Sequence, residues 1–390
     1  MTTERLDALA APDGQAVLAE LAALDAAELT GPAGLRLGAQ LRARYPTELV
    51  VDAFGQAELR AAARAKFARA DAMWFTRAGL EQASTEVVAQ HRRTRFAGAG
   101  AVADLCCGIG GDLLALAADH DVRAVDRDPV HLWMAARNAA AHGLGHRVTT
   151  VEADVREVDL TGVDAVFVDP ARRAGGRRHR VGESEPPLAW CAALVERVGA
   201  VGVKAAPGID HDLAPPGWEI EFVSVGRELK EAALWSPALA GSRTRATVLP
   251  SGAVLQPAPG DAVPVRAPGG YLLDPDPAVT RAGLVAELAR ATGTWQLDGQ
   301  IAFLSGDEPV QTPFARTLRV LDSAPWHQKR LPQRLRDLDV GAVDIRRRGL
   351  AGDVDALHRT LQRSLTGTRR VTLVMTRLDD RPWALVCSDL

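Results

Sequence analysis

The spacing of apolar residues divides the chain into parts with different expected architectures. Over residues 1–97, leucines such as Leu6 and Leu9 recur at helical spacing, and no strand signal occurs. Over 98–250, short apolar runs alternate with helical stretches, which is typical of a parallel sheet with helices on its faces. The pattern therefore predicts a helical N-terminal domain over 1–97, followed by an α/β domain over 98–250.

Within the α/β part, each apolar run has the length of a strand. We expect strands at 101–105, 122–126, 147–151, 164–168, 199–205, 219–226 and 244–249, and helices at 111–118, 128–142 and 187–197. The last two strands are expected to pair as an antiparallel hairpin. Upstream of the sheet, Ser84 precedes a helical run and is expected to cap a helix that extends through Arg95.

The remainder of the chain begins with a change of composition. Prolines and glycines are concentrated over 251–270, which predicts a linker. Residues 271–390 return to a mixed pattern, which predicts a small α+β domain with a hairpin through Asp379 and Asp380. Its helices are expected at 277–291, 328–337 and 352–365, and its strands at 301–304, 317–321, 340–347, 371–377 and 383–387.

The first predicted strand runs into a glycine-rich turn, Asp104-Leu-Cys-Cys-Gly-Ile-Gly-Gly-Asp112. Glycines have no Cβ, so they let backbone N–H groups approach a ligand closely at the start of a helix. About 20 residues further on, Asp126 ends the second predicted strand, where an acidic residue binds ribose hydroxyls in doubly wound nucleotide-binding folds. Together these features predict a nucleotide site, whereas a glycine-rich turn alone is also common in ordinary strand-to-helix connections.

Two more acidic residues follow at successive strand ends. Asp154 comes after the run 148–151, and Asp169 closes a fully apolar strand and begins the sequence Asp169-Pro-Ala-Arg172. A dehydrogenase is the competing interpretation of this order. However, the Gly-x-Gly-x-x-Gly spacing of dehydrogenases is absent, and the Asp-Pro-Ala-Arg step has no role in hydride transfer.

In this order of motifs the chain resembles the class I S-adenosylmethionine-dependent methyltransferases. The resemblance implies a Rossmann-like methyltransferase sheet and S-adenosyl-L-methionine as the cofactor. It also implies that the glycine turn binds the methionine end, that the second acid binds the ribose and that the third lies beside the adenine. The cofactor-binding residues expected on this basis are Asp104, Cys106, Gly108, Gly110, Gly111, Asp126, Arg127, Asp154 and Val155.

The fourth motif of that family faces the substrate, and the resemblance implies catalytic roles for Asp169, Pro170 and Arg172. In amino-group methyltransferases the acid and the backbone carbonyl after the proline hold the nitrogen in line with the methyl group. Arg172 replaces the family's aromatic residue, and its guanidinium plane can stack on a base or bind a phosphate. Carbon methylation of uracil is disfavoured, because Ala205 and Ala206 stand where a cysteine nucleophile would be expected.

The run 172–180 carries five arginines and no acidic residue. It is expected to leave the strand end that faces the substrate, where arginines would attract a phosphate backbone. A solvated loop without a ligand is the alternative interpretation of the run, and Lys204 could likewise line the same cleft or only cap its strand. The residues expected to bind RNA are Arg173, Arg177, Arg178, Arg180 and Lys204.

Two further segments resemble RNA-modifying enzymes. Trp74, Phe75 and the helix start 84–89 resemble the segment before the fold in trimethylguanosine synthase, although a packing contact explains Trp74 and Phe75 equally well. Between Arg316 and Arg348 there are nine Lys or Arg residues and four acidic residues. The order of helical domain, Asp-Pro-Ala-Arg-Arg motif and basic C-terminal domain resembles a family of bacterial methyltransferases with a THUMP-like C-terminal domain.

Composition narrows the remaining classes of protein. The 390 residues carry a net charge of −3, so any nucleic-acid surface has to be local. The N-terminus lacks the pattern of a signal peptide, and no apolar run of about 18 residues predicts a membrane span. Four scattered cysteines predict neither a disulfide framework nor a metal site, which fits a reducing cytoplasm.

We therefore expect a cytoplasmic enzyme that transfers a methyl group from S-adenosyl-L-methionine to a nitrogen of an RNA base, in tRNA or rRNA, with no membrane or metal partner. One alternative is a methyltransferase that acts on a small molecule or a protein. The other is a cofactor-binding protein without turnover. None of these patterns determines the oligomeric state.

Overall fold

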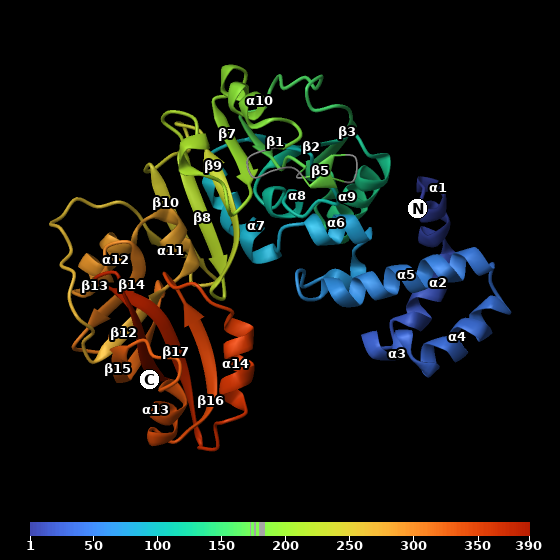
Figure 1. Cartoon of the computed structure of the whole chain (residues 1–390). Coiled ribbons are helices and arrows are strands. Elements are labelled where there is room, and N and C mark those ends of the chain that lie inside the picture. Colours follow the sequence, from blue (N-terminus) through green and yellow to red (C-terminus); the bar gives the residue numbers. More distant parts are fainter. Residues whose placement is uncertain (172, 175–176, 179–183) are drawn as a thin grey trace. The chain divides into compact units, whose positions relative to one another are not determined.

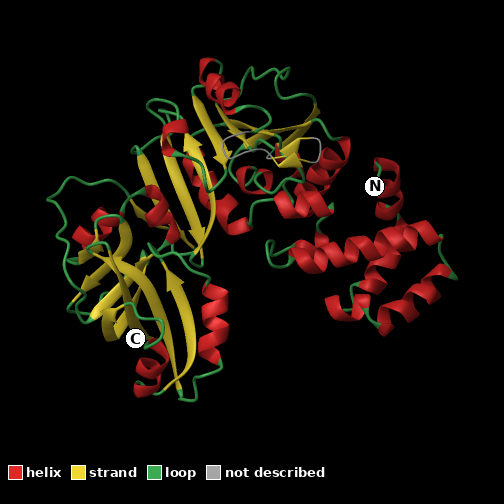
Figure 2. Cartoon of the chain, viewed as in Figure 1, coloured by secondary structure: helices red, strands yellow, loops and turns green. Residues whose placement is uncertain are grey.

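The chain divides into two compact units (Figures 1 and 2). The first unit comprises Met1–Glu219 and Ala232–Gly241, and the second comprises Ile220–Glu231 and Ser242–Leu390. The first unit holds the N-terminal helices and the parallel sheet with the nucleotide motif, whereas the second holds a separate mixed sheet. The computed structural model describes every residue except 172, 175–176 and 179–183.

The first unit begins with helices only. Two of them start with a proline at the first helical position, where a backbone N–H would have no hydrogen-bond partner within the helix. Asp25 and Glu28 form a capping box at the start of a third helix. The helices are α1 (Thr3–Ala10), α2 (Pro12–Leu21), α3 (Ala26–Thr30), α4 (Pro32–Arg42), α5 (Thr47–Ala63), α6 (Arg77–Gln82) and α7 (Glu86–Arg93), with 3-10 turns at Ala70–Ala72 and Thr94–Phe96.

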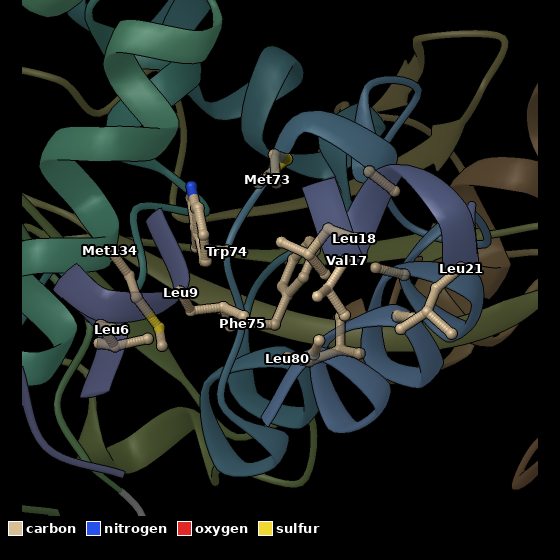
Figure 3. Close-up of a cluster of buried hydrophobic side chains, with 14 of the residues drawn as sticks. Leu6, Leu9, Val17, Leu18, Leu21, Met73, Trp74, Phe75, Leu80 and Met134 are labelled. Atoms are coloured by element: carbon tan, nitrogen blue, oxygen red, sulfur yellow. The ribbon is translucent and has the colours of Figure 1, made fainter. Parts of the chain in front are cut away.

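The N-terminal helices share a hydrophobic core with helix α9 (Pro129–Ala141) of the α/β part. Leu6 is fully buried in the same cluster as Met134 of α9 (Figure 3). The side-chain amide of Asn138, also on α9, accepts a hydrogen bond from the Trp74 N–H and donates to the carbonyl oxygens of Trp74 and Ile109. These bonds fix the segment before the sheet against both α9 and the glycine turn.

The sheet of the first unit is parallel and confirms the predicted Rossmann-like fold class. Its strands follow the order β3-β2-β1-β4-β7, and the end of β9 pairs antiparallel to β7. These strands are β1 (Ala101–Leu105), β2 (Asp121–Asp126), β3 (Val148–Glu152), β4 (Ala165–Val168), β7 (Ala200–Ala205) and β9 (Glu228–Trp235). The remaining elements are the antiparallel pair β5 (Arg173–Ala174) and β6 (Arg177–Arg178), helices α8 (Leu113–Leu116) and α10 (Leu188–Ala193), and 3-10 turns at Gly145–Arg147, Leu194–Glu196 and His211–Leu213.

The register of the parallel strands brings their carboxyl ends to one edge of the sheet. Leu105 of β1 pairs with Val168 of β4, so Asp169 begins level with the glycine turn. Val168 also pairs with Val203 of β7, which places Asp169 beside Lys204. Ligands of doubly wound sheets bind outside this edge, so the register alone gathers the predicted motifs where a ligand would lie.

The expected antiparallel hairpin between the strands at 219–226 and 244–249 is wrong. These strands, β8 (Glu219–Val225) and β10 (Thr244–Leu249), are parallel, because the chain returns through β9 between them. Three of the first four residues of β9 are charged, so this strand does not begin with an apolar run that would predict it. Its second half is nevertheless buried from Glu231 to Trp235.

The second unit contains β8, β10 and β11 (Ala253–Leu255), together with a seven-stranded sheet in the order β13-β14-β12-β15-β18-β17-β16. The strands of this sheet are β12 (Tyr271–Pro275), β13 (Trp295–Asp298), β14 (Ile301–Gly306), β15 (Ala315–Pro325), β16 (Val340–Arg347), β17 (Arg369–Leu378) and β18 (Arg381–Asp389). The helices are α11 (Pro277–Ala282), α12 (Val285–Thr292), α13 (Leu331–Asp337) and α14 (Val354–Gln362).

Two turns in the second unit depend on left-handed backbone. The single helix expected over 277–291 is in fact two helices, because Gly283 has a φ of +74° and ends α11. The hairpin predicted through Asp379 and Asp380 is confirmed, since both residues have positive φ and β17 and β18 pair on either side of them. Aspartate tolerates this conformation better than most residues.

Three arginines of the second unit share one buried carboxylate. Asp274 on β12 is 3% exposed and lies 3.1 Å from Arg227, 3.6 Å from Arg346 and 3.0 Å from Arg348. Burial lowers the pKa of the Arg348 guanidinium, Asp274 opposes this shift, and the charges of Arg346 and Arg227 add to it. The carboxylate therefore balances positive charge that would otherwise lie partly buried without a counter-ion.

Removal of this carboxylate should destabilise the second unit. We expect Asp274→Ala to lower its free energy of unfolding by about 3 kcal/mol, because it leaves partly buried guanidinium groups unpaired. The matched control is Asp344→Ala, which breaks an ion pair with Arg370, whose side chain is 71% exposed; it should cost about 1 kcal/mol or less. Thermal melting of the full chain checks this, and equal losses in the two variants would contradict it.

Candidate active site

A cavity of about 650 Å³ opens at the carboxyl ends of the parallel strands. Part of its wall comes from α6 and the residues after it, namely Gly79, Glu81, Gln82 and Ala83. The predicted cofactor-binding residues that line it are Asp104, Cys106, Gly108, Gly111, Asp126, Arg127, Asp154 and Val155. Asp169, Pro170 and Lys204 also line it, whereas Gly110 does not.

The glycines of the turn serve two purposes. Gly108, with a φ of +53°, has no atom within 4 Å of the position of a Cβ, so it leaves open space beside the cavity. A Cβ on Gly110 would lie 3.5 Å from Ala135 of α9, and one on Gly111 would lie 3.1 Å from Ala83. Gly110 and Gly111 therefore permit close packing, whereas Gly108 leaves room for a ligand.

Asp104 carries a buried carboxylate at the end of β1. Its side chain is 1% exposed, and neither carboxylate oxygen has a hydrogen-bond partner among the residues that the structure describes. Burial, followed by repulsion from Asp169, raises the pKa of Asp104 to about 8, against the opposing attraction of Arg92. Such a group costs free energy unless a ligand supplies the missing donor. Its position on the cavity wall suits a positively charged donor.

Asp126 accepts hydrogen bonds from two backbone N–H groups. Its Oδ2 accepts from Gly108 at 2.9 Å, and its Oδ1 accepts from Asp128 at 3.0 Å. The helix cap of α9 is Asp128, whose side chain accepts from the Val130 N–H. Asp126 is thus held in place without being used as a helix cap, and each of its oxygens can accept a further bond.

Asp154 and Val155 follow β3 and line the same cavity. The Asp154 carboxylate accepts hydrogen bonds from the backbone N–H and the guanidinium of Arg156. That guanidinium also pairs with Glu185, another residue of the cavity wall. No sequence motif singles out Arg156 or Glu185, because their pairing depends on two loops that meet only in the folded chain.

Asp169, at the carboxyl end of β4, forms an ion pair with Lys204. The Lys204 Nζ lies 2.7 Å from Asp169 Oδ2, and it also donates to Ser84 Oγ at 3.1 Å and to the carbonyl oxygen of Gln82 at 3.5 Å. The Lys204 side chain is only 10% exposed. Lys204 thus lines the cavity, one of the two positions that the sequence left open for it, and its expected contact with RNA stays a prediction.

Ser84, Arg92 and Asp112 form a buried network beside the cavity that the sequence did not predict. Ser84 Oγ donates to Asp112 at 3.0 Å and accepts from Arg92 at 3.2 Å, and Arg92 also pairs directly with Asp112. The expected capping role of Ser84 is wrong, because Thr85 is at the N-cap position of α7. Asp112 is the one sequence feature that could have indicated this network, because it is a charged residue between the glycines of the turn and a buried helix.

The arginine run lies largely outside the described residues. Arg172 and Arg180 are not described, and for Arg173, Arg177 and Arg178 only the backbone is. That backbone forms the β5–β6 pair, with Arg173 opposite Arg178. The roles expected for these five arginines therefore stay predictions.

The described part of the chain shows neither a metal-binding cluster nor a membrane-spanning helix. No group of three or more His, Cys, Asp or Glu residues in that part is arranged to hold a metal ion. None of the helices that the structure describes is both long and apolar enough to span a bilayer. The cysteines Cys106, Cys107, Cys191 and Cys387 are free.

Three family models match separate parts of the chain. Residues 99–183 match the RNA cap guanine-N2 methyltransferase family, and residues 315–389 match a THUMP domain-like family. Residues 2–63 match a domain of unknown function. The first match contains the glycine turn and the strands β1 to β4, whose ends form much of the cavity.

The chain is also similar to known proteins over most of its length. Uncharacterized S-adenosylmethionine-dependent methyltransferases from Mycobacterium tuberculosis strains CDC 1551 and H37Rv are 42% identical to it over 318 residues, which cover 78% of this chain and 84% of each relative. A crystal structure assigned as a methyltransferase from Porphyromonas gingivalis W83 shares the fold, with a TM-score of 0.72 and 20% identity over 95% of this chain and 96% of that one. The chain therefore belongs to the family of S-adenosylmethionine-dependent methyltransferases.

Proposed function

We propose that this methyltransferase acts on RNA, at a nitrogen of a base, and that it does so in the cytoplasm. The observation that carries the substrate class is the Asp169-Pro170 turn on the cavity wall, inside the segment that matches RNA cap guanine-N2 methyltransferases. A carboxylate at this strand end can accept a hydrogen bond from an amino group and hold its lone pair toward a methyl donor. The four free cysteines fit a reducing compartment.

The lining residues fit S-adenosyl-L-methionine as the methyl donor. Asp104 would accept the α-ammonium group of the cofactor, which is the donor that the described residues do not supply. Asp126 would bind the two ribose hydroxyls, because one carboxylate offers an acceptor to each. Asp154 and the Val155 N–H would meet the edge of the adenine. The open space beside Gly108 would admit the methionine end of the cofactor next to the backbone N–H groups of the turn.

The protein's part in the reaction is mostly orientation. When bound, the cofactor supplies an electrophilic methyl group on a cationic sulfur. Asp169 and the carbonyl of Pro170 would accept hydrogen bonds from the reacting nitrogen and align its lone pair. The cofactor would supply the methyl group and keep the electron pair of its C–S bond on sulfur, and Asp169 would accept the N–H proton that the acceptor loses and pass it to water. Alignment of this kind can account for several kcal/mol of the barrier, roughly 7 or more in the best cases.

Two basic segments of the sequence support an RNA substrate. The run 172–180 would attract phosphate groups toward the strand end that carries Asp169. The second unit carries the THUMP-like match over 315–389. Between Arg316 and Arg348 the sequence contains nine basic and four acidic residues. Phosphate contacts of this kind fix the position of a nucleic acid, whereas the base itself is read at the cavity.

Mass spectrometry of nucleosides from total tRNA and rRNA tests the proposed function. Cells that lack the gene should lose one methylated nucleoside, and the purified chain with the cofactor should restore it in RNA from those cells. Methyl transfer to a protein or a small molecule, with RNA nucleosides unchanged, would favour the rival substrates. Cofactor binding without transfer to any of these substrates would favour a protein without turnover.

The ribose contact predicts a large effect at Asp126. Asp126→Ala should weaken binding of S-adenosylhomocysteine about 100-fold, because two hydrogen bonds to a charged acceptor are lost. Asp121→Ala, at the exposed opposite end of β2, is the matched control and should leave the affinity unchanged. Isothermal titration calorimetry gives both values, and an Asp126 variant with wild-type affinity would remove the ribose role.

The buried carboxylate of Asp104 predicts a pH-dependent affinity. Its pKa of about 8 means that the unliganded group must release a proton to accept the cofactor's ammonium. Between pH 6 and about 7.7, where that ammonium stays protonated, affinity should rise with pH by up to about tenfold per unit. Calorimetry in buffers of different ionisation enthalpy should detect the released proton, and Asp104→Asn should abolish both effects. A wild-type affinity that is independent of pH would exclude this role.

The arginine run predicts a salt-dependent RNA contact. Arg177→Glu combined with Arg178→Glu should weaken binding of unmodified tRNA about tenfold or more and reduce its salt dependence, while cofactor affinity stays the same. Arg36→Glu with Arg42→Glu, two exposed changes on α4, is the control. Filter binding at several salt concentrations measures both pairs. Unchanged RNA affinity in the first pair would remove the phosphate-binding role of the run.

A further inference from the structure

Lys204 connects two parts of the active site that are far apart in sequence. Its ammonium group has three hydrogen-bond donors, and Asp169 Oδ2, Ser84 Oγ and the Gln82 carbonyl oxygen accept at 2.7, 3.1 and 3.5 Å. Ser84 and Gln82 belong to the segment before the sheet, whereas Asp169 belongs to the strand end that faces the acceptor. The Lys204 ammonium therefore links the wall over the cofactor position to the residue proposed to orient the acceptor.

This contact restricts the orientation of the Asp169 carboxylate. Val168 and Val203 are paired on neighbouring parallel strands, so the backbone positions of Asp169 and Lys204 are set by the sheet. The ammonium group holds Oδ2, which leaves Oδ1 to accept an N–H of the substrate. Ser84 in turn is bonded to Asp112, so the lysine is anchored to a buried group as well as to the carboxylate.

We infer that Lys204 is a positioning residue that orients Asp169, so that the free Oδ1 of this carboxylate meets the acceptor nitrogen. This inference rests on the proposed function and adds a residue that acts on the acceptor only through Asp169.

Three variants test this role. Lys204→Met removes the ammonium and keeps an unbranched side chain, and Lys204→Arg keeps a cation. Lys230→Met is the control, because the Lys230 ammonium pairs with Glu228 at 2.6 Å and does not line the cavity. The assay follows transfer from tritiated S-adenosyl-L-methionine to total RNA from cells that lack the gene. Calorimetry with S-adenosylhomocysteine and thermal melting are measured in parallel.

Lys204→Met should lower kcat on RNA about 100-fold, because the orientation of the acceptor is lost, while affinity for S-adenosylhomocysteine changes by less than about threefold. Lys204→Arg should regain a large part of the rate, and Lys230→Met should match the wild type.

Wild-type kcat in Lys204→Met would overturn the inference. Parallel losses of rate, cofactor affinity and melting temperature, without recovery in Lys204→Arg, would show an ion pair that only stabilises the fold, and would also overturn it. A wild-type chain that methylates no RNA would refute the proposed function and the inference together. The inference alone fails when the wild type methylates RNA and Lys204→Met does so equally well.

Discussion

The buried ion pair between Arg92 and Asp112 is the interaction on which the arrangement of the active site depends. Arg92 comes from α7 and Asp112 from the end of the glycine turn, and their side chains are 2% and 6% exposed. Burying two charges costs roughly several kcal/mol of desolvation free energy for each charge. Pairing and hydrogen bonds have to offset this cost. Ser84 bonds to both, and the guanidinium lies 4.5 Å from the centroid of the Phe167 ring on β4. The segment before the sheet therefore satisfies its buried charge only when it lies against the glycine turn.

From this pair a line of polar contacts reaches Asp169 on the cavity wall. Ser84 accepts from Lys204, and Lys204 pairs with Asp169, so one network holds both the glycine-rich turn and the end of β4. Asp104 lies close enough to Asp169 and Arg92 to feel their charges, yet no described residue donates to its carboxylate. The charges of Arg92, Asp112, Lys204 and Asp169 are thus compensated within the protein, whereas the carboxyl group of Asp104 has no hydrogen-bond donor among the described residues.

The sequence predicts a site residue well when neighbouring residues determine its position, and poorly when tertiary packing brings its partner from a distant part of the chain. Asp104 and Asp126 end apolar runs, and the alternation of strands and helices already implies that such ends meet at one edge of a parallel sheet. Ser84 precedes a helical run, which favours a cap, but its actual partner Asp112 is brought to it by tertiary packing. Lys204 likewise has a local position that suits a substrate contact, and only the register of β4 and β7 shows that it faces Asp169. The strand β9 was missed for the opposite reason, because its local charges conceal a buried second half.

The lining of the cavity is predominantly acidic. Its acidic lining residues are Glu81, Asp104, Asp112, Asp126, Asp128, Asp154, Asp169 and Glu185, and its basic ones are Arg127, Arg156 and Lys204. An excess of carboxylates favours a cationic methyl donor over its neutral product, which assists release after transfer, and it repels phosphate. For the proposed RNA substrate, a base has to enter the cavity while its phosphates stay outside, as in enzymes that turn a base out of its stack. Under the proposed function, the basic run 172–180 and the basic part of the second unit would bind the backbone, and the cavity would take the base.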